Sequence, residues 1–129
     1  GTDIDRESLA YAERGEYTDF AMTDIDPQTR DHWFEHDTTW RLRAEARANV
    51  RFETLDLIRD EFPQRQHLIF CRNVIIYFER GVQEALFRRF HEALAPGGFL
   101  VLGKVEALFG TATGLFSPVA PRERVYRRT

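Results

Sequence analysis

The sequence predicts an α/β layered fold, and three observations support this prediction. Short apolar runs at residues 67–71 and 99–103 have the length and composition of buried strands. Between them, residues 79–94 carry apolar side chains at helical spacing. Because a helical crossover joins neighbouring strands in parallel, we expect at least this part of the sheet to be parallel. A chain of 129 residues suits one small domain, spanning residues 1–129.

The first half of the chain predicts several short elements. Asp5 is a good N-cap for a helix over residues 6–14, which Gly15 can end. We expect a short helix over residues 28–36, with Trp33 and Phe34 as its apolar patch, and a strand over 38–42. A helical turn at 44–49 precedes a strand over 50–57, where the alternation of apolar residues changes phase near Thr54.

The second half of the chain predicts strands around one long helix. Residues 67–71 read as a strand covered on both faces. The helix over 79–94 is expected to stop at Pro96-Gly97-Gly98, which turns the chain into the strand 99–103. Two more strands, 115–120 and 124–128, are joined through Pro121 and suggest a C-terminal antiparallel hairpin.

Composition and charge exclude some function classes. A formal net charge of −3 argues against a nucleic-acid-binding protein, whose affinity comes largely from Lys and Arg. The basic stretch 122–128 is better explained as a solvated strand edge. Cys71 is alone and forms no intrachain disulfide. Since no apolar run has the length of a membrane span and no leader is evident, we expect a soluble, cytoplasmic protein without membrane insertion.

Polar residues that follow strands are the first candidates for ligand binding, because ligands of open α/β sheets collect at the carboxyl ends of the strands. Asp3 follows the first strand-like residues, Asp56 and Leu57 follow the second strand, and Asn73 with Val74 follows the third. The Asp3 carboxylate could accept two ribose hydroxyls or cap a helix, and spacing does not decide between these. Asp56 with Leu57 could pair with an adenine amino group and enclose its ring, and Asn73 could offer a donor and an acceptor. As isolated residues, both are better explained by turn formation.

Three longer motifs narrow this choice. Residues 69–78 read Ile-Phe-Cys-Arg-Asn-Val-Ile-Ile-Tyr-Phe, residues 94–100 read Leu-Ala-Pro-Gly-Gly-Phe-Leu, and residues 103–106 read Gly-Lys-Val-Glu. This order closely resembles the chemotaxis-receptor (CheR-type) methyltransferase family, in which a CRN strand end precedes a helix, a PGG turn and a GHSE-like strand end. The resemblance extends over nearly the whole chain.

The resemblance implies an incomplete Rossmann-like S-adenosylmethionine methyltransferase sheet with the C-terminal hairpin. It implies that Asp3 contacts the cofactor ribose, Asp56 and Leu57 the adenine, and Asn73 with Val74 the end near the reactive sulfur. Family members transfer the methyl group of S-adenosylmethionine to glutamate side chains of chemoreceptors, leaving S-adenosylhomocysteine. The expected partner is therefore a chemoreceptor or another glutamate-bearing protein.

The resemblance also implies that Tyr77 lies beside the transferred methyl group. A glutamate is ionised at neutral pH and the sulfonium is already activated, so the reaction needs no general base. Orientation alone can contribute up to about 7–11 kcal/mol to such a transfer. Tyr77 would then be a positioning hydrogen-bond donor; the alternative is a core ring with a wet hydroxyl.

The chain departs from the family pattern in three places. Lys104 and Val105 replace the His and Ser of the GHSE-like motif, which leaves that segment without an assigned role. Asp56 stands where the family more often has Asn. The third departure is the absence of two family segments that would precede Thr2: an N-terminal helical domain and a glycine-rich cofactor loop. In the family, the strand that leads into this loop lies between the strands that here end at Asp3 and Cys71. We therefore expect the isolated chain to bind S-adenosylmethionine poorly and to be inactive alone.

Two other functions compete with this reading. His32, Glu35 and His36 match the H-x-x-E-H pattern of one metalloprotease class, but no third zinc ligand is evident, and we assign no metal. The second alternative is a non-catalytic, methyltransferase-like interaction module that has lost cofactor binding. The strand edges exposed by a missing strand would invite strand addition by a partner, or a strand-swapped homodimer.

Overall fold

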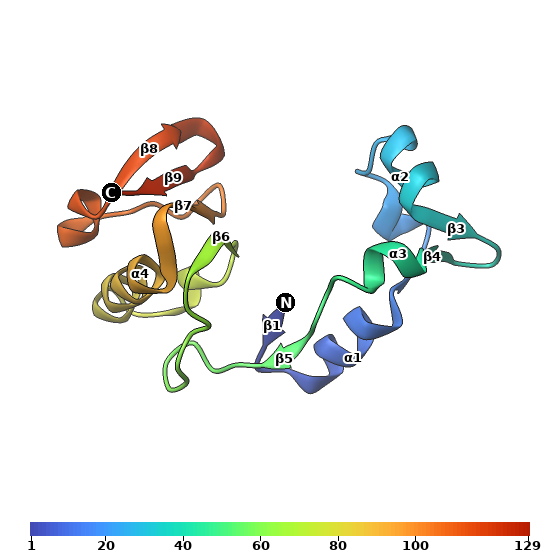
Figure 1. Cartoon of the computed structure of the whole chain (residues 1–129), viewed down its shortest axis with the longest axis horizontal. Coiled ribbons are helices and arrows are strands. Elements are labelled where there is room, and N and C mark those ends of the chain that lie inside the picture. The colour runs from blue at the N-terminus through green and yellow to red at the C-terminus, as the bar shows by residue number, and fades with distance from the viewer. The chain divides into compact units, whose positions relative to one another are not determined.

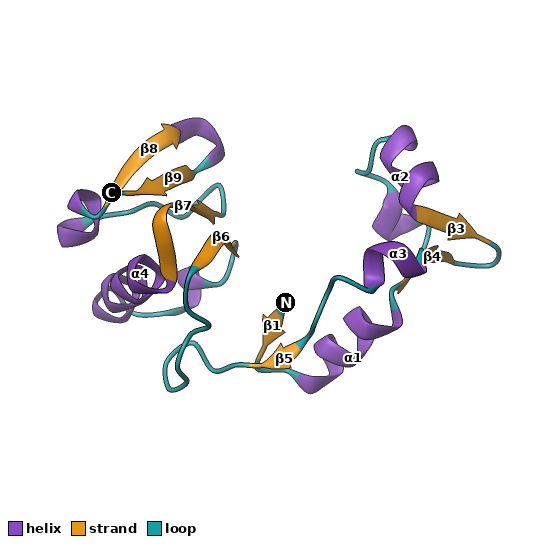
Figure 2. Cartoon of the chain, in the orientation of Figure 1, coloured by secondary structure: helices purple, strands orange, loops and turns teal.

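The computed structural model describes all 129 residues and shows a mixed α/β protein with two compact units, Gly1–Asp56 and Leu57–Thr129. Helices and strands are interleaved along the chain in both units (Figures 1 and 2). Each unit has its own sheets, and the two are described separately below.

The first unit contains short elements in two small sheets. In order these are β1 (Thr2–Asp3), α1 (Arg6–Arg14), β2 (Glu16–Tyr17), the 3-10 helix η1 (Phe20–Met22), α2 (Pro27–Trp33), β3 (Phe34–His36), β4 (Trp40–Leu42), α3 (Ala44–Arg47) and β5 (Glu53–Thr54). Strands β1 and β5 pair in parallel, whereas β2, β4 and β3 form an antiparallel sheet with β4 in the middle.

Helix α1 begins and ends where the sequence predicts. The Asp5 carboxylate accepts hydrogen bonds from the backbone N–H groups of Glu7 and Ser8. Gly15 follows the helix in the left-handed conformation, with φ of 62°, and its N–H donates to the Ala12 carbonyl. Both ends are thus satisfied by residues that prefer these positions.

The helix predicted over residues 28–36 is wrong in its last three residues. Helix α2 starts at Pro27, which follows the N-cap Asp26, and ends at Trp33. Phe34 is already extended and begins β3, which pairs with β4. The pairing with β4 supplies backbone hydrogen bonds to residues 34–36, and this tertiary contact overrides the local helical pattern.

The strand predicted over residues 50–57 is also shorter than expected. Only Glu53 and Thr54 form β5, because β1 offers just two residues for pairing. The change of phase near Thr54 falls where this strand ends. A strand extends only as far as its residues pair with a neighbouring strand. The alternating apolar residues before Glu53 and after Thr54 therefore lie outside β5.

The second unit is built around one mixed sheet. Its elements are β6 (Gln66–Cys71), the 3-10 helix η2 (Ile75–Tyr77), α4 (Arg80–Ala93), β7 (Leu94–Leu102), the 3-10 helix η3 (Gly110–Gly114), β8 (Phe116–Ala120), the 3-10 helix η4 (Pro121–Glu123) and β9 (Val125–Arg128). The strand order is β6-β7-β9-β8, in which β6 and β7 are parallel and the remaining pairs antiparallel. The parallel pair joined through α4 is as predicted.

The core of this unit lies between α4 and the sheet. Phe87, Leu86 and Phe90 of α4 are buried against Leu100 and Leu102 of β7. Figure 1 shows α4 beside the strands it connects. Burial of such side chains is the main source of stability, at roughly 1.5–3 kcal/mol each.

Three expectations for this unit need correction. Strand β6 is not covered on both faces, since Leu68 and Phe70 are 47% and 67% exposed. Strand β7 already begins at Leu94, before Pro96-Gly97-Gly98, and the glycines lie at an irregularity that separates its pairing at Leu94 from that at Phe99. The basic tail is not a sheet edge, because β9 lies between β7 and β8. The edge strand on this side is β8, which folds back outside β9, and β6 is the edge strand on the other side.

No helix in the structure combines the length and the apolar character needed to cross a membrane.

Candidate cofactor site

In the first unit, Asp3 and Asp56 lie at the same end of the β1–β5 pair. Asp3 is the last residue of β1 and pairs with Thr54, the last residue of β5. The Leu55 N–H donates to the Asp3 carbonyl at 3.0 Å, which continues the ladder one step towards Asp56. Because the strands are parallel, both carboxylates follow carboxyl ends, where ligands of such sheets bind.

The Asp3 side chain also has a local structural contact. One of its oxygens, Oδ1, accepts the Asp5 N–H at 2.9 Å, while Asp5 itself caps α1. Asp3 therefore shapes the turn between β1 and α1 without being the N-cap. Its side chain is exposed.

In the second unit, Arg89 holds the segment that begins at Leu57. The guanidinium of Arg89, on α4, donates to the carbonyls of Leu57, Ile58 and Asp60. It also lies 4.1 Å from the centre of the Phe62 ring. Several carbonyls are thus satisfied by one side chain, which fixes this loop to the helix.

The loop after β6 carries the other predicted cofactor residues. Asn73 adopts the left-handed conformation, with φ of 60°, and Val74 returns to the right-handed region before η2 begins at Ile75. A left-handed residue followed by a right-handed one turns successive N–H groups towards a common point. Asn73 and Val74 are both exposed.

The common point is the carboxylate of Glu106. Its Oε2 accepts the Asn73 N–H at 2.9 Å, and its Oε1 accepts the N–H groups of Val74 and Ile75, both at 2.9 Å. Oε2 also accepts the Gly103 N–H at 2.6 Å. Glu106 is only 4% exposed, so its charge is compensated by these four amides. One carboxylate therefore ties the loops after β6 and β7 together.

Gly103 makes this close approach feasible. A Cβ at this position would lie 2.7 Å from Glu106 Oε2 and 2.8 Å from the Asn73 nitrogen, and would also collide with Asn73 Oδ1. No side chain larger than hydrogen fits there without moving the loops. The glycine is required by proximity, since its φ is not in the left-handed region.

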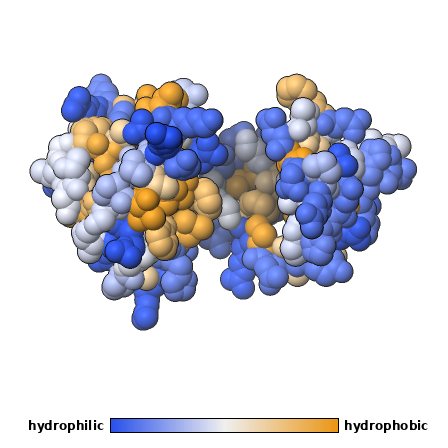
Figure 3. All heavy atoms as spheres, turned by 90° about the horizontal axis from the view of Figure 1, so that it is seen from above, coloured by the Kyte–Doolittle hydropathy of each residue, from blue (hydrophilic) through white to orange (hydrophobic).

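Tyr77 is the last residue of η2, and its side chain is 81% exposed. The alternative prediction, that the Tyr77 ring is part of the core, is therefore wrong. Ile76 and Val105 are exposed as well, at 45% and 76%. Apolar side chains of this unit reach its surface in the space-filling view (Figure 3). Exposed apolar side chains beside polar loops are common at binding sites.

The cysteine that ends β6 is buried and chemically quiet. Burial raises the pKa of the Cys71 thiol to about 12, and the nearby Glu106 charge adds to this effect. Since the thiolate is the nucleophile, Cys71 is not suited to catalysis at neutral pH.

The predicted residues fall into two groups. Asp3 and Asp56 belong to the first unit, and Leu57, Asn73, Val74 and Tyr77 to the second. Sequence reasoning missed the two residues that organise the second group, Glu106 and Arg89. The glutamate was visible as the last member of the GHSE-like motif, but a helical arginine gave no signal.

The H-x-x-E-H pattern does not form a helical zinc site. His32 is in α2, which ends at Trp33, whereas Glu35 and His36 are in β3. The two histidines are therefore not one helical turn apart on a single helix. No group of three or more His, Cys, Asp or Glu is placed to hold a metal ion.

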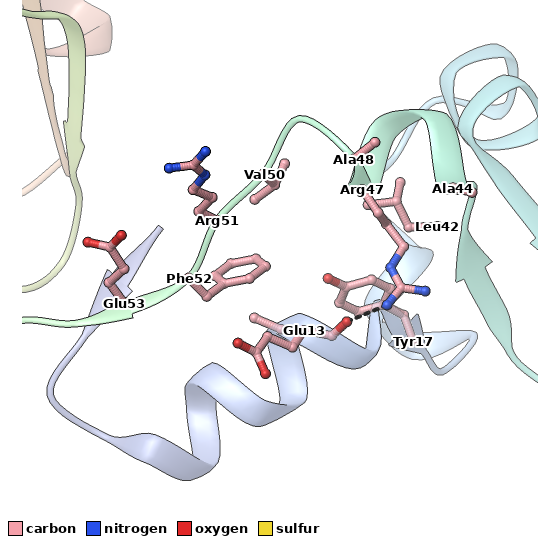
Figure 4. Close-up of a pocket in the computed structure, with 11 residues that line it drawn as sticks. Glu13, Tyr17, Leu42, Ala44, Arg47, Ala48, Val50, Arg51, Phe52 and Glu53 are labelled. Atoms are coloured by element: carbon pink, nitrogen blue, oxygen red, sulfur yellow. Dashed lines mark hydrogen bonds between the residues drawn. The ribbon is translucent and has the colours of Figure 1, made fainter.

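A hollow in the first unit contains none of the predicted site residues. It has a volume of about 730 Å³ and lies among α1, α3 and the segment that leads into β5 (Figure 4). Phe52 and Tyr17 contribute rings to its wall, and Arg47 donates to the Glu13 carbonyl at 2.7 Å across it.

Comparison with known protein families decides the family. The model of the CheR methyltransferase S-adenosylmethionine-binding domain matches residues 1–125. The chain belongs to the CheR methyltransferase family. The domain of this family binds S-adenosylmethionine, which is the cofactor expected from the sequence.

Curated members of the CheR family are similar over most of this chain. The chemotaxis protein methyltransferase of Klebsiella aerogenes is 38% identical over 112 residues, which cover 81% of this chain and 39% of the relative. The probable chemotaxis protein methyltransferase of Rhizobium etli is 33% identical over 124 residues, covering 92% and 46%. Chemotaxis protein methyltransferase 1 of Pseudomonas aeruginosa is 35% identical over 112 residues, covering 83% and 40%. The chain thus spans less than half the length of these relatives.

Proposed function

We propose that the protein transfers the methyl group of S-adenosylmethionine to glutamate side chains, forming methyl esters. The observation that carries this proposal is the loop after β6, where exposed Asn73 and Val74 follow a parallel strand and are held by the buried Glu106. Membership of the CheR family supports the cofactor and the reaction class.

Each predicted residue has a role in this proposal. Asp3 binds the ribose hydroxyls, and Asp56 with Leu57 binds the adenine. Both acids follow the carboxyl ends of paired parallel strands, and carboxylate oxygens accept hydrogen bonds from hydroxyl and amino groups. Asn73 and Val74 bind the cofactor near its sulfur. These residues belong to a partial catalytic domain over residues 1–129, with an incomplete Rossmann-like sheet and a C-terminal antiparallel hairpin.

The chemistry requires positioning more than acid or base catalysis. A glutamate oxygen attacks the methyl carbon, the carbon–sulfur bond breaks, and the sulfur leaves as neutral S-adenosylhomocysteine. The carboxylate is ionised at neutral pH, so no proton has to be removed. Tyr77, with an exposed hydroxyl-bearing ring, hydrogen-bonds and orients the reacting carboxylate.

The protein substrate in this proposal is a chemoreceptor. The relatives named above are chemotaxis protein methyltransferases, and this chain matches them across most of its own length. Because it spans less than half of theirs, we also propose that residues beyond these 129 supply the rest of the cofactor pocket, and that the chain alone binds cofactor weakly.

The test uses the complete gene product that contains this chain. Incubation with methyl-labelled S-adenosylmethionine and chemoreceptor should label the receptor, and mild base should release the label as methanol, since esters are base-labile. Label that resists base would contradict glutamate esterification. Calorimetry with S-adenosylhomocysteine should give micromolar binding to the complete product and much weaker binding to residues 1–129.

Tyr77→Phe sharpens the test, since it removes only the hydroxyl. We expect kcat to fall by about 10- to 100-fold, the range in which a lost positioning contact acts, with little change in cofactor affinity. Tyr11→Phe, at a half-exposed ring of α1, is the matched control. If kcat is unchanged in Tyr77→Phe, Tyr77 has no positioning role. The proposed reaction class would not be affected by that result.

A second candidate is a non-catalytic interaction module. It is favoured by the open edge of β6, which has β7 as its neighbour on one side and carries exposed Leu68 and Phe70. Such an edge can accept a strand from a partner or from a second copy. A concentration-dependent dimer in light scattering, without cofactor binding, would favour this function over methyl transfer.

A further inference from the structure

Glu106 is a buried carboxylate that the proposed reaction does not use directly. It is 4% exposed and lies in the turn after β7. A buried charge is unfavourable unless hydrogen bonds compensate it, so a residue of this kind has to be explained by its partners.

Its partners are the amides of the proposed cofactor loop. Three consecutive N–H groups, from Asn73, Val74 and Ile75, point at its two oxygens. Three successive amides of this kind form an anion-binding concavity. In this protein the anion is supplied by the chain itself, so the concavity is filled and the loop has one defined shape.

The second loop is held in the same way. Oε2 also accepts the Gly103 N–H, and the Glu106 N–H donates to the Gly103 carbonyl at 3.0 Å, which closes a tight turn. Cys71 and Leu102 are paired in the β6–β7 register, so the two loops start side by side. The carboxylate therefore sets the distance between them.

We propose that Glu106 is a positioning residue for cofactor binding. It holds residues 73–75 in their bound shape, so that Asn73 and Val74 receive the cofactor without further ordering of the loop. A loop that is ordered before binding avoids the entropy loss of ordering on binding, which raises affinity. This inference rests on the proposed function, because it concerns the same cofactor.

Glu106→Gln tests the inference with the smallest change of shape. The amide keeps one acceptor oxygen and replaces the other with an NH₂ donor, so backbone amides that now share the carboxylate would face a donor. We expect the Kd for S-adenosylhomocysteine to rise by about 10-fold or more, since mispaired buried groups of this type are costly. Glu106→Asp keeps the charge and both acceptors, and should restore part of the affinity.

Glu84→Gln is the matched control. Glu84 of α4 also accepts hydrogen bonds from a loop, at 2.9 Å from the Thr111 N–H and 2.6 Å from its hydroxyl. It belongs to the same unit and contacts η3, not the loop after β6. Its replacement should loosen η3 and leave cofactor affinity unchanged.

Two further readouts separate positioning from general stability. Hydrogen exchange without cofactor should speed up at the amides of residues 73–75 in Glu106→Gln, while the β7 amides stay protected. In an Asn73→Ala background, Glu106→Gln should weaken binding by a smaller factor than in the wild type, because the residue it positions is gone.

The outcomes are distinguishable when measured on the complete gene product. If the wild type binds S-adenosylhomocysteine and either Glu106 variant binds it equally well, the inference is wrong and the proposed function stands. If the wild type does not bind, the proposed function fails, and the inference fails with it. Should Glu106→Gln not fold, Glu106→Asp carries the comparison, with an intermediate loss of affinity as the supporting result.

Discussion

The first unit keeps its helices at the surface, whereas the second packs one face of α4 into a core. Helices α1, α2 and α3 contain no buried residue. Helix α4 buries Leu86, Phe87, Phe90 and Ala93. In the first unit, rings meet edge to face, as Tyr17 does with Tyr11 and Phe34, and the ends of α1 are fixed by local caps.

This difference affects how each unit presents its candidate residues. Asp3 lies in an exposed turn that its own side chain shapes, so its position depends on local hydrogen bonds. Asn73 lies between a buried strand end and the buried Glu106, so its position depends on the core. We infer that the second unit holds its own candidate residues more rigidly than the first unit holds Asp3, because packed interiors resist deformation.

The largest expected effect is at Phe87, which is fully buried. Phe87→Ala should lower the free energy of unfolding by about 3–5 kcal/mol, because it removes a ring and leaves a cavity. Urea unfolding followed by circular dichroism measures this loss. Phe20→Ala in the first unit, where the ring is 90% exposed, should stay within about 0.5 kcal/mol of the wild type. Equal effects at the two sites would remove the contrast between the units.

A smaller effect is expected at Gly103. Gly103→Ala brings a methyl group against Glu106 and Asn73, and should destabilise the protein by about 1–3 kcal/mol, as overpacking does. Cofactor affinity should fall with it, measured by calorimetry. Gly81→Ala is the control, since nothing lies within 4 Å of its added Cβ and alanine favours the helix. A neutral Gly103→Ala would show that the two loops have room to move apart.

The next effect is a loss of stability at alkaline pH that comes from the buried Cys71 thiol. The pKa of Cys71 is raised from 9.0 to about 12, so the folded protein keeps the proton that the unfolded chain loses above pH 9. This contribution to stability is complete below pH 9 and declines as pH rises towards 12, by about 1 kcal/mol at pH 10. Unfolding of the wild type and Cys71→Ala between pH 8 and 10.5 measures it. If the Cys71→Ala protein loses the same stability over this pH range, the decline comes from other ionisable groups.

The smallest effect is at Asp5 in the first unit. The Ser8 hydroxyl and the Glu7 amide lower the pKa of this carboxyl below its ordinary value of 3.8. The cap therefore stabilises α1 above that value and is lost as the pH falls through the lower pKa of the folded state. Circular dichroism should show α1 fraying at acidic pH in the wild type. Asp5→Asn caps without titrating, and should lose less helix over the same range.

The sequence predicted well what depends on neighbouring residues. Helix α1, between Asp5 and Gly15, and helix α4, with its apolar period, begin and end within a residue or so of the expected positions. It was wrong where distant pairing decides the outcome, as at Phe34, which leaves α2 to join β4. The contact between Glu106 and Asn73 spans 33 residues, and no local pattern encodes it.

The placement of the candidate residues shows the same limit. Motif matching named Asn73, in the loop after β6, and Tyr77, at the end of η2, and both are exposed. It could not reveal that Arg89 holds the carbonyls that begin at Leu57, because an arginine in a helix has many ordinary uses. The roles of the named residues remain predictions until binding and rates are measured.

In a protein proposed to esterify glutamates, its own glutamates are competing acceptors of the methyl group. Glu106 is protected from this fate by its environment, since four amide hydrogens occupy its lone pairs and bulk solvent hardly reaches it. A carboxylate engaged in this way is a poor nucleophile. On the proposed function, the hydrogen bonds that order the loop would therefore also make Glu106 itself a poor acceptor of the methyl group.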